Sequence, residues 1–97
     1  MQMMRRLDDS KPYLIDTGMY IRLVKWNPNG NVLAVCGSIN EERQEPKGCI
    51  QFYSARGQHL RSLRVPGNSG CVSSIAWEGF GLRMVLCIDS NVLFANI

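Results

Sequence analysis

The chain has 97 residues, enough for one small domain or for part of a larger one. Apolar residues make up 45% and charged residues 20%, a composition that excludes an intrinsically disordered chain. The formal net charge of +3 is small and the two signs are interleaved, so we expect no nucleic-acid partner. No apolar run approaches the ~20 residues that cross a bilayer, and the N-terminal residues lack the pattern of a signal peptide. We therefore expect a soluble, cytosolic protein.

Short apolar and aromatic runs separated by turn residues dominate the chain, a pattern typical of β-strands. Residues 1–12 precede these runs and are expected to form a flexible segment. The first strand signal, over Pro12–Thr17, is weak. Seven stronger runs follow in chain order: Ile21–Trp26, Val32–Ser38, Cys49–Ser54, Leu60–Val65, Val72–Trp77, Leu82–Ile88 and Val92–Ile97.

The connections between these runs predict how the strands pair. Four are short and rich in turn residues: Asn27–Gly30, Ala55–Gln58, Glu78–Gly81 and Asp89–Asn91. A fifth connection, Asn40–Gly48, is longer and highly charged, and predicts a mobile surface loop. Because parallel pairing needs a long crossover, strands joined by short turns must be antiparallel neighbours. The sequence therefore predicts a series of up-and-down meanders.

The chain also contains an internal repeat. Placing Trp26 over Trp77, a shift of 51 residues, aligns Val24–Gly30 with Ile75–Gly81 and Leu33–Cys36 with Met84–Cys87. Gln51-Phe52-Tyr53 then matches Leu93-Phe94-Ala95 if nine residues of the charged loop are treated as an insertion, which a surface loop tolerates at little cost. The remaining period of about 42 residues lies within the ~40–45 residues expected for a propeller blade of the WD type.

These observations predict an all-β fold, a partial WD-repeat β-propeller spanning residues 13–97. One complete four-stranded antiparallel blade is expected at 21–65, most of a second blade at 71–97, and one strand of a preceding blade at Pro12–Thr17. Middle strands that are covered on both faces should be continuously apolar, as Val32–Cys36 and Met84–Ile88 are. The competing fold is an ordinary β-sandwich. Since single blades cannot bury their faces, the isolated chain is expected to self-associate.

Several segments of both repeats carry a family resemblance. They are Leu14–Tyr20, Val24–Asn27, Val32–Val35, Gln51–Tyr53, Gly57–Leu60, Leu63–Gly67, Ser74–Gly79 and Phe94–Ile97. In these segments the chain resembles one WD-repeat subunit of intraflagellar transport complex A, over nearly all residues after about residue 13. The usual Trp-Asp ending of the third strand is absent, and Phe52-Tyr53-Ser54 and Phe94-Ala95-Asn96 stand in its place.

The resemblance implies a non-catalytic scaffold that binds other protein subunits of a transport complex. It implies roles in retrograde intraflagellar transport, cilium assembly and ciliary membrane-protein trafficking, in the cytoplasm and in the axoneme and basal body of the cilium. A second resemblance is to the tubby-like propeller protein, which implies a substrate receptor of a ubiquitin ligase. Either role makes membrane contact indirect or weak.

We predict no catalytic, cofactor-binding or metal-binding residues. Asp89 and Ser90 could form a triad with His59 only if distant turns met, and Asp16 and Asp89 are better interpreted as acceptors for backbone N–H groups. Trp26 and Trp77 are expected to anchor the core. The acid-free stretch Arg56–Arg64, with Arg61 between, is the one locally basic patch; it is either plain surface or a candidate partner or lipid-headgroup site.

The four cysteines, Cys36, Cys49, Cys71 and Cys87, have no C-x-x-C spacing, and each lies in or beside an apolar run. They are expected to be buried, reduced thiols rather than disulfides or zinc ligands.

Overall fold

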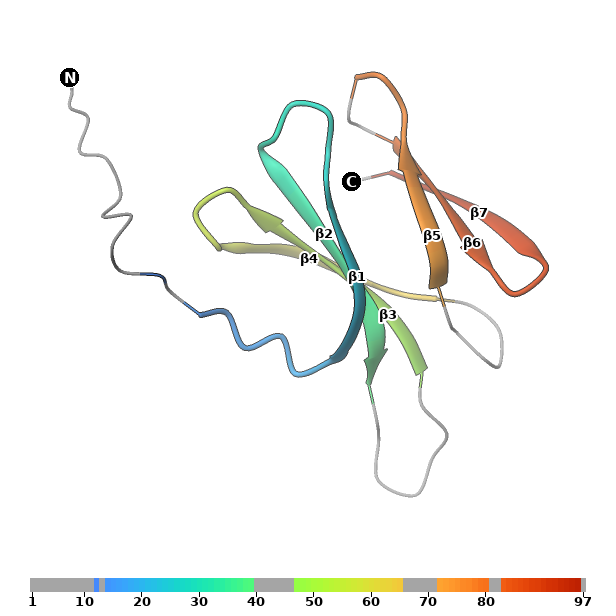
Figure 1. Ribbon diagram of the computed structural model, residues 1–97, viewed down its shortest axis with the longest axis horizontal. Helices are drawn as coiled ribbons and strands as arrows, with labels where there is room; N and C mark the ends of the chain where they lie inside the picture. Colours follow the sequence, from blue (N-terminus) through green and yellow to red (C-terminus); the bar gives the residue numbers. More distant parts are fainter. Residues whose placement is uncertain (1–11, 13, 40–46, 66–71, 81–82, 97) are drawn as a thin grey trace.

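The computed structural model describes residues 12, 14–39, 47–65, 72–80 and 83–96, and the regular structure of these residues is entirely β-strand. The strands are β1 (Tyr20–Trp26), β2 (Val32–Ile39), β3 (Lys47–Ser54), β4 (His59–Arg64), β5 (Val72–Trp77), β6 (Arg83–Ile88) and β7 (Asn91–Asn96). They form two antiparallel sheets in the orders β1-β2-β3-β4 and β5-β6-β7 (Figure 1). Neighbours in each sheet are also neighbours in sequence, so the predicted meanders are confirmed.

The strand predicted at Pro12–Thr17 is wrong for residues 14–17, while Tyr13 lies outside the described residues. Residues 14–17 have no strand partner and lead through a bend at Gly18, whose φ is +70°, into β1. A strand needs a neighbour to pair with, and no strand of the described residues forms a β-ladder with this segment. The charged loop predicted at Asn40–Gly48 is also shorter, because Lys47 and Gly48 pair with Ile39 and Ser38 as part of β3. Residues 40–46 lie outside the described residues.

The backbone register shows that the sequence repeat is a structural repeat. Trp26 pairs with Leu33 in the first sheet, and Trp77 pairs with Met84 in the second. Each sheet also has a register shift at the same place in its first strand, between Ile21 and Leu23 and between Val72 and Ser74. Bulges are specific backbone features, so their recurrence at the same shift of 51 residues supports equivalence independently of side-chain type. The two sheets are copies of one module.

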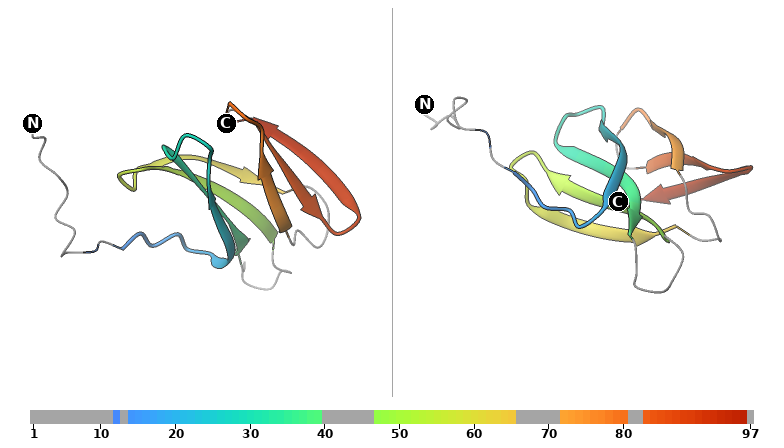
Figure 2. Two further views of the ribbon diagram at one scale, coloured as in Figure 1. Left: turned by 45° about the horizontal axis from the view of Figure 1, so that its top comes forward. Right: turned by 60° about the horizontal axis from the view of Figure 1, so that its bottom comes forward.

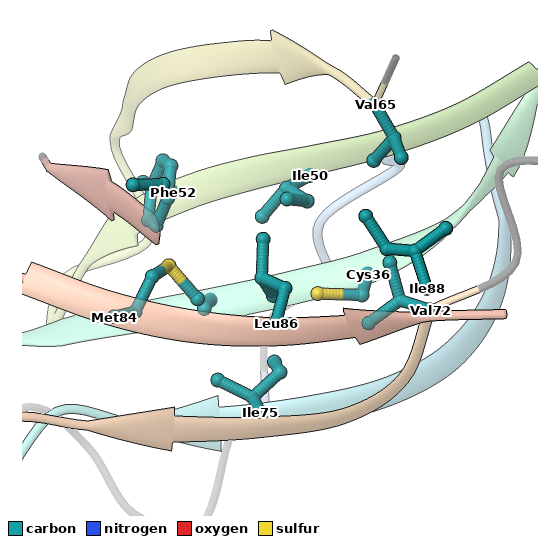
Figure 3. Close-up of a cluster of buried hydrophobic side chains, with 11 residues drawn as sticks. Cys36, Ile50, Phe52, Val65, Val72, Ile75, Met84, Leu86 and Ile88 are labelled. Carbon is teal, nitrogen blue, oxygen red and sulfur yellow. The ribbon is translucent and has the colours of Figure 1, made fainter. Parts of the chain in front are cut away.

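The two sheets stack face to face, with the innermost strands β1 and β5 side by side (Figures 1 and 2). Between them lies one core of buried side chains, most of which Figure 3 shows. The first sheet contributes Ala34, Cys36, Ile50 and Phe52, and the second contributes Val72, Ile75, Met84, Leu86, Ile88 and Ala95. Burying a large apolar side chain contributes about 2 kcal/mol, so this interface is the main apolar source of stability in the described residues.

The sheets present opposite faces to each other. Cys36 points into the core and is fully buried, whereas its repeat equivalent Cys87 is only half-buried and alternates with the buried Leu86 and Ile88. The second sheet thus meets the first with the face that the first sheet turns away. This head-to-tail stacking of copies is that of successive propeller blades, and it leaves one face open at each end of the pair.

Burial along the strands follows from this stacking. The middle strand β2 is buried over Ala34–Gly37 on both faces, as predicted, although the second sheet covers only the face of Ala34 and Cys36. On the other face, Thr17 of the segment before β1 is hydrogen-bonded to Gln51 of the neighbouring strand β3. β6 alternates instead, because neither a sheet nor such a segment of the described residues covers its second face. β4 is exposed along most of its length, as expected for a strand at the outer edge of a sheet.

The turn between β1 and β2 is organised by one buried polar side chain, Asn27, which is 5% exposed. Its Oδ1 accepts hydrogen bonds from the backbone N–H groups of Asn31 (3.0 Å) and Val32 (3.1 Å). Its backbone oxygen accepts from the N–H of Gly30, whose φ of +72° suits glycine. The predicted Asn-Pro-Asn-Gly turn is confirmed, and Asn27 is the residue that closes it.

Candidate interaction surfaces

The two repeat tryptophans sit in different surroundings. Trp77 packs on the shared core, and its ring meets that of Phe52 edge to face, with centroids 6.3 Å apart. Trp26 is 47% exposed. The prediction that both indoles anchor the core is therefore confirmed for Trp77 and wrong for Trp26. The cause is the stacking direction, because no sheet of the described residues precedes the first one and supplies a partner for Trp26.

Trp26 lies on the face that the first sheet turns away from the second, which we call the Trp26 face. Its members in β1, β2 and β3, assigned from the register, are Ile21, Val24, Trp26, Leu33, Val35, Gln51 and Tyr53. On the β1 side, Ile21, Val24 and Trp26 are about half-exposed. Apolar side chains this exposed on one strand mark a surface that can be buried against another protein surface.

The β3 side of the Trp26 face is more polar and is crossed by the N-terminal segment, residues 14–19, which leads into β1 (Figure 2). Gln51 Nε2 donates a hydrogen bond to the backbone oxygen of Thr17 (3.0 Å), and the Tyr53 hydroxyl donates to Gln51 Oε1. The segment is held locally because Asp16 Oδ1 accepts from the N–H of Gly18 (3.0 Å). The prediction that Asp16 is a backbone acceptor is confirmed. Burial raises the pKa of the Tyr53 hydroxyl, with the nearby Cys49 and Asp16 adding to the effect.

The second open surface is the outer face of the second sheet, which we call the Phe94 face. It consists of Ala76, Val85, Cys87, Val92 and Phe94, paired across β5, β6 and β7. Val92 and Phe94 are 59% and 55% exposed. The Arg83 guanidinium lies over the Phe94 ring, 4.5 Å from its centroid, and also approaches Glu78 at 3.5 Å. This cation partly covers the face.

A groove of about 500 Å³ runs between the outer strands of the two sheets. It is lined by Arg61, Leu63, Arg64, Leu93, Phe94, Ala95 and Asn96. Arg61 Nη1 donates a hydrogen bond to the backbone oxygen of Asn96 (2.8 Å) and so links the sheets across the groove. The groove combines leucine and alanine side chains with two arginines.

The basic patch predicted at Arg56–Arg64 is divided by the fold. Arg61 pairs with Phe52 and Arg64 with Cys49, so the register places them on opposite faces of β4, although both reach the groove. Arg56 lies in the hairpin turn before β4, where its N–H donates to Ser54 Oγ. The three arginines do not form one surface, which weakens the lipid-headgroup interpretation.

The residues of the conceivable triad are not brought together. His59 begins β4, and its Nε2 lies 2.7 Å from Ser62 Oγ, while its ring contacts Tyr53 edge to face. Asp89 and Ser90 form the β6–β7 turn at the opposite side of the molecule (Figure 1). Asp89 has a φ of +55°, which aspartate tolerates better than most residues. The cluster of His59, Ser62 and Tyr53 was not predicted. It depends on the register shift between Phe52 and Tyr53 that pairs Tyr53 with His59, and the sequence pattern does not reveal this shift.

The cysteines of the described residues, Cys36, Cys49 and Cys87, are free thiols. Burial raises the pKa of Cys36 to about 12, with a smaller contribution from Cys49. Burial also raises the pKa of Cys49, and the nearby Arg64 cation partly offsets this rise because it favours the thiolate. Cys36 and Cys49 are buried as predicted, Cys87 is only half-buried, and Cys71 lies outside the described residues. Within the same residues, no group of three or more histidine, cysteine or carboxylate side chains could hold a metal ion.

The residues that the structure describes include no helix of the length and apolar character needed to span a membrane.

Two equivalent up-and-down sheets stacked head to tail, with open faces at both ends, define the class of protein as a partial WD-type β-propeller. Comparison with known proteins agrees with this class. The family model described as WDR35/TULP4 N-terminal, a β-propeller, matches residues 1–97. The chain belongs to this family.

The similar proteins are WD repeat-containing protein 35 of Rattus norvegicus and of Mus musculus, each 47% identical over 97 residues, and that of Homo sapiens, 45% identical. The matches cover 99% of this chain, which spans 8% of the length of these relatives. WD-repeat propellers are in general non-catalytic protein-interaction scaffolds, and the surfaces described above are of the kind that such a scaffold uses.

Proposed function

We propose that this chain is a piece of the protein-interaction scaffold of an intraflagellar transport complex A subunit. The proposed roles are retrograde transport, cilium assembly and ciliary membrane-protein trafficking, in the cytoplasm and at the axoneme and basal body. The observation that carries the proposal is the 45–47% identity to WD repeat-containing protein 35 along the whole chain. The resemblance of the repeat segments to a subunit of that complex supports the same role.

The structure supports the scaffold part of this proposal through what it exposes. The groove lined by Leu63, Leu93 and Arg61 offers a surface to other proteins. His59 and Asp89 stand in unrelated parts of the fold, so the conceivable triad of His59, Asp89 and Ser90 is not assembled. The proposed partners are other subunits of the transport complex.

A replacement experiment tests the proposal. The matching stretch of mouse WD repeat-containing protein 35 is exchanged for this chain in ciliated cells that lack the endogenous protein. We expect the chimera to co-purify with the other transport-complex subunits, to localise to the basal body and axoneme, and to restore cilia. A matched chimera with Phe52→Asp, which places a charge in the core between the sheets, should do none of these.

A chimera that folds and is expressed but captures no transport subunit would contradict the proposal. The alternative function is a ubiquitin-ligase substrate receptor of the tubby-like kind, which the family description also includes. Exchange of the same stretch in the tubby-like protein, followed by capture of ubiquitin-ligase subunits, would favour this alternative if only that chimera is active.

A further inference from the structure

The outer edge of β4 does not depend on which sheets lie before or after the first one in a propeller. β4 is the last strand in the order of the first sheet, so its outer edge pairs with no strand of the described residues. The two sheets pack through their faces, with β1 and β5 innermost and β4 at the opposite edge of its sheet from β1 (Figure 1). Further sheets stacked on either face would therefore cover side chains of the first sheet but not the backbone edge of β4.

The backbone of β4 offers hydrogen-bonding groups along this edge. The N–H of Val65 donates to the backbone oxygen of Gly48 (3.0 Å), so Val65 faces β3. In an antiparallel ladder every second residue faces the same neighbour, so Leu63 and Arg61 also face β3, and Ser62 between them turns its N–H and C=O to the outer edge. An added strand can therefore pair with Ser62 without disturbing the first sheet.

The first sheet is also strongly basic. Its described residues, 20–39 and 47–65, contain no carboxylate and six cationic side chains: Arg22, Lys25, Lys47, Arg56, Arg61 and Arg64. Half of these cations lie in β4 or in the turn before it. The described residues of the second sheet carry one cation, Arg83, and two carboxylates, Glu78 and Asp89. The charge along the β4 edge thus favours a negatively charged partner.

The placement of the arginines selects the shape of this partner. The register sends Arg61 and Arg64 to opposite faces of β4, and a lipid surface meets one face of a sheet at a time. A strand paired with β4 alternates its own side chains in the same way, so it can place carboxylates beside both arginines. Arg61 already donates to the backbone oxygen of Asn96, but this bond uses only one of the guanidinium N–H groups.

We propose that an extended, acidic segment of another protein adds to the outer edge of β4 as a fifth strand of the first sheet. This inference names a partner chemistry for the interaction scaffold proposed above and rests on that proposed function. Main-chain hydrogen bonds to the edge hold the segment, and carboxylates on its two faces pair with Arg61 and Arg64. A second copy of this chain is a poor partner, because its β4 would place arginines beside arginines.

Binding of a capped octapeptide to the purified chimera with mouse WD repeat-containing protein 35 tests the proposal, because the neighbouring blades are then present. In this acidic peptide, pairs of glutamate alternate with pairs of threonine, so both faces of its strand carry carboxylates. Fluorescence anisotropy should show binding that weakens with added salt. A peptide with lysine in place of glutamate should not bind. The acidic peptide with every backbone amide N-methylated should not bind either, although its charge is unchanged.

Variants of the chimera separate the edge from the overall charge. Ser62→Pro removes the outward N–H but no hydrogen bond to β3, so the sheet should fold while binding of the acidic peptide weakens by about fivefold. Arg64→Gln should weaken binding by about threefold, as loss of an exposed ion pair does. The matched control is Arg22→Gln, which removes the same charge from β1 at the opposite edge and should leave binding unchanged. Thermal melting checks that each variant is folded.

Three results would each overturn the proposal. They are binding of the N-methylated peptide as tight as that of its parent, equal effects of Arg22→Gln and Arg64→Gln, and failure of the acidic peptide to bind, with or without binding of anionic phosphatidylserine vesicles. Capture of transport-complex subunits is measured on the same chimera. If subunits are captured but the peptide is not bound, this inference alone fails. If the peptide is bound but no subunit is captured, the proposed function alone fails.

Discussion

Trp26 and Trp77 occupy the same position in two copies of one module, yet only Trp77 is packed. The faces that carry them differ in the same way. Around Trp77 the face is apolar to its outer strand, where Leu93 and Ala95 contact the first sheet. Around Trp26 the corresponding residues are Gln51 and Tyr53, which form hydrogen bonds with each other and with the N-terminal segment. Position in the repeat fixes the direction of a side chain, and the neighbouring sheet decides whether it is buried.

The largest expected difference between the modules lies in the tryptophans themselves. Trp77→Ala should lower the free energy of unfolding by about 3 kcal/mol, because it removes a large ring from the shared core. Trp26→Ala should cost less than about 1 kcal/mol, since the ring is already half in solvent. Urea unfolding at chain concentrations low enough to avoid association measures both. Equal losses would mean that the two faces are covered alike.

A second comparison concerns the bulge in the first strand of each sheet. In the first sheet the bulge brings the backbone of β1 so close to Gly37 that an added Cβ would lie 2.1 Å from the Tyr20 carbonyl oxygen. Gly37→Ala should therefore destabilise the fold by about 2–3 kcal/mol, as overpacking against backbone does.

The matched control is Gly79→Ala, in the β5–β6 turn, where an added Cβ meets nothing within 4 Å. It should change stability by less than about 0.5 kcal/mol. Chemical denaturation of both variants would refute the described bulge geometry if they proved equally stable.

The turns before β2 and β6 provide a third comparison. Asn27→Ala leaves the N–H groups of Asn31 and Val32 without the side-chain acceptor that now satisfies them, and should cost about 1–2 kcal/mol. Its repeat equivalent Glu78 is exposed and only approaches Arg83, so Glu78→Ala should cost about 0.5 kcal/mol or less. Thermal unfolding followed by circular dichroism would show whether the penalties differ in this order.

A further expected effect is a pH dependence of stability that originates at Cys36. Its pKa of about 12 lies above the unfolded value of 9.0, so the folded state favours the protonated thiol. The stabilisation is complete below pH 9 and is lost as the pH rises from 9 toward 12, by at most about 1.4 kcal/mol per pH unit. Cys36→Ala should reduce this slope, while Cys87→Ala, on the open face, provides the control. Identical slopes in the two variants would contradict the burial of Cys36.

Most of the fold could be predicted from the sequence because the information is local and repeated. Turn residues such as Asn27 and Gly57 mark the ends of strands, and the Trp26–Trp77 alignment predicts the register that the structure has. The failures have a common cause. Pro12–Thr17 has strand composition but no partner to pair with, and the apolar character of Trp26 could not reveal that its face is open. Burial depends on which sheet lies opposite, and a strand pattern does not contain that information.

The surfaces were predicted less well than the fold for a related reason. The acid-free stretch around Arg61 is continuous in sequence, but strand alternation sends Arg61 and Arg64 to opposite faces. The groove edged by Arg61 and Asn96 joins residues from different sheets, so only the stacking of the sheets could show it.

A double-mutant cycle on Phe52 and Trp77 tests most directly whether the two copies stack face to face. The free energies of unfolding of Phe52→Leu, Trp77→Leu and the double variant are compared with that of the unmodified chain, and the same cycle is run with Trp26→Leu in place of Trp77→Leu. The structure predicts a coupling of about 0.5–1.5 kcal/mol for Phe52 with Trp77, whose rings are in contact, and none for Phe52 with Trp26 on the opposite face. Absence of coupling in the first cycle, or equal coupling in both, would contradict the stacked arrangement.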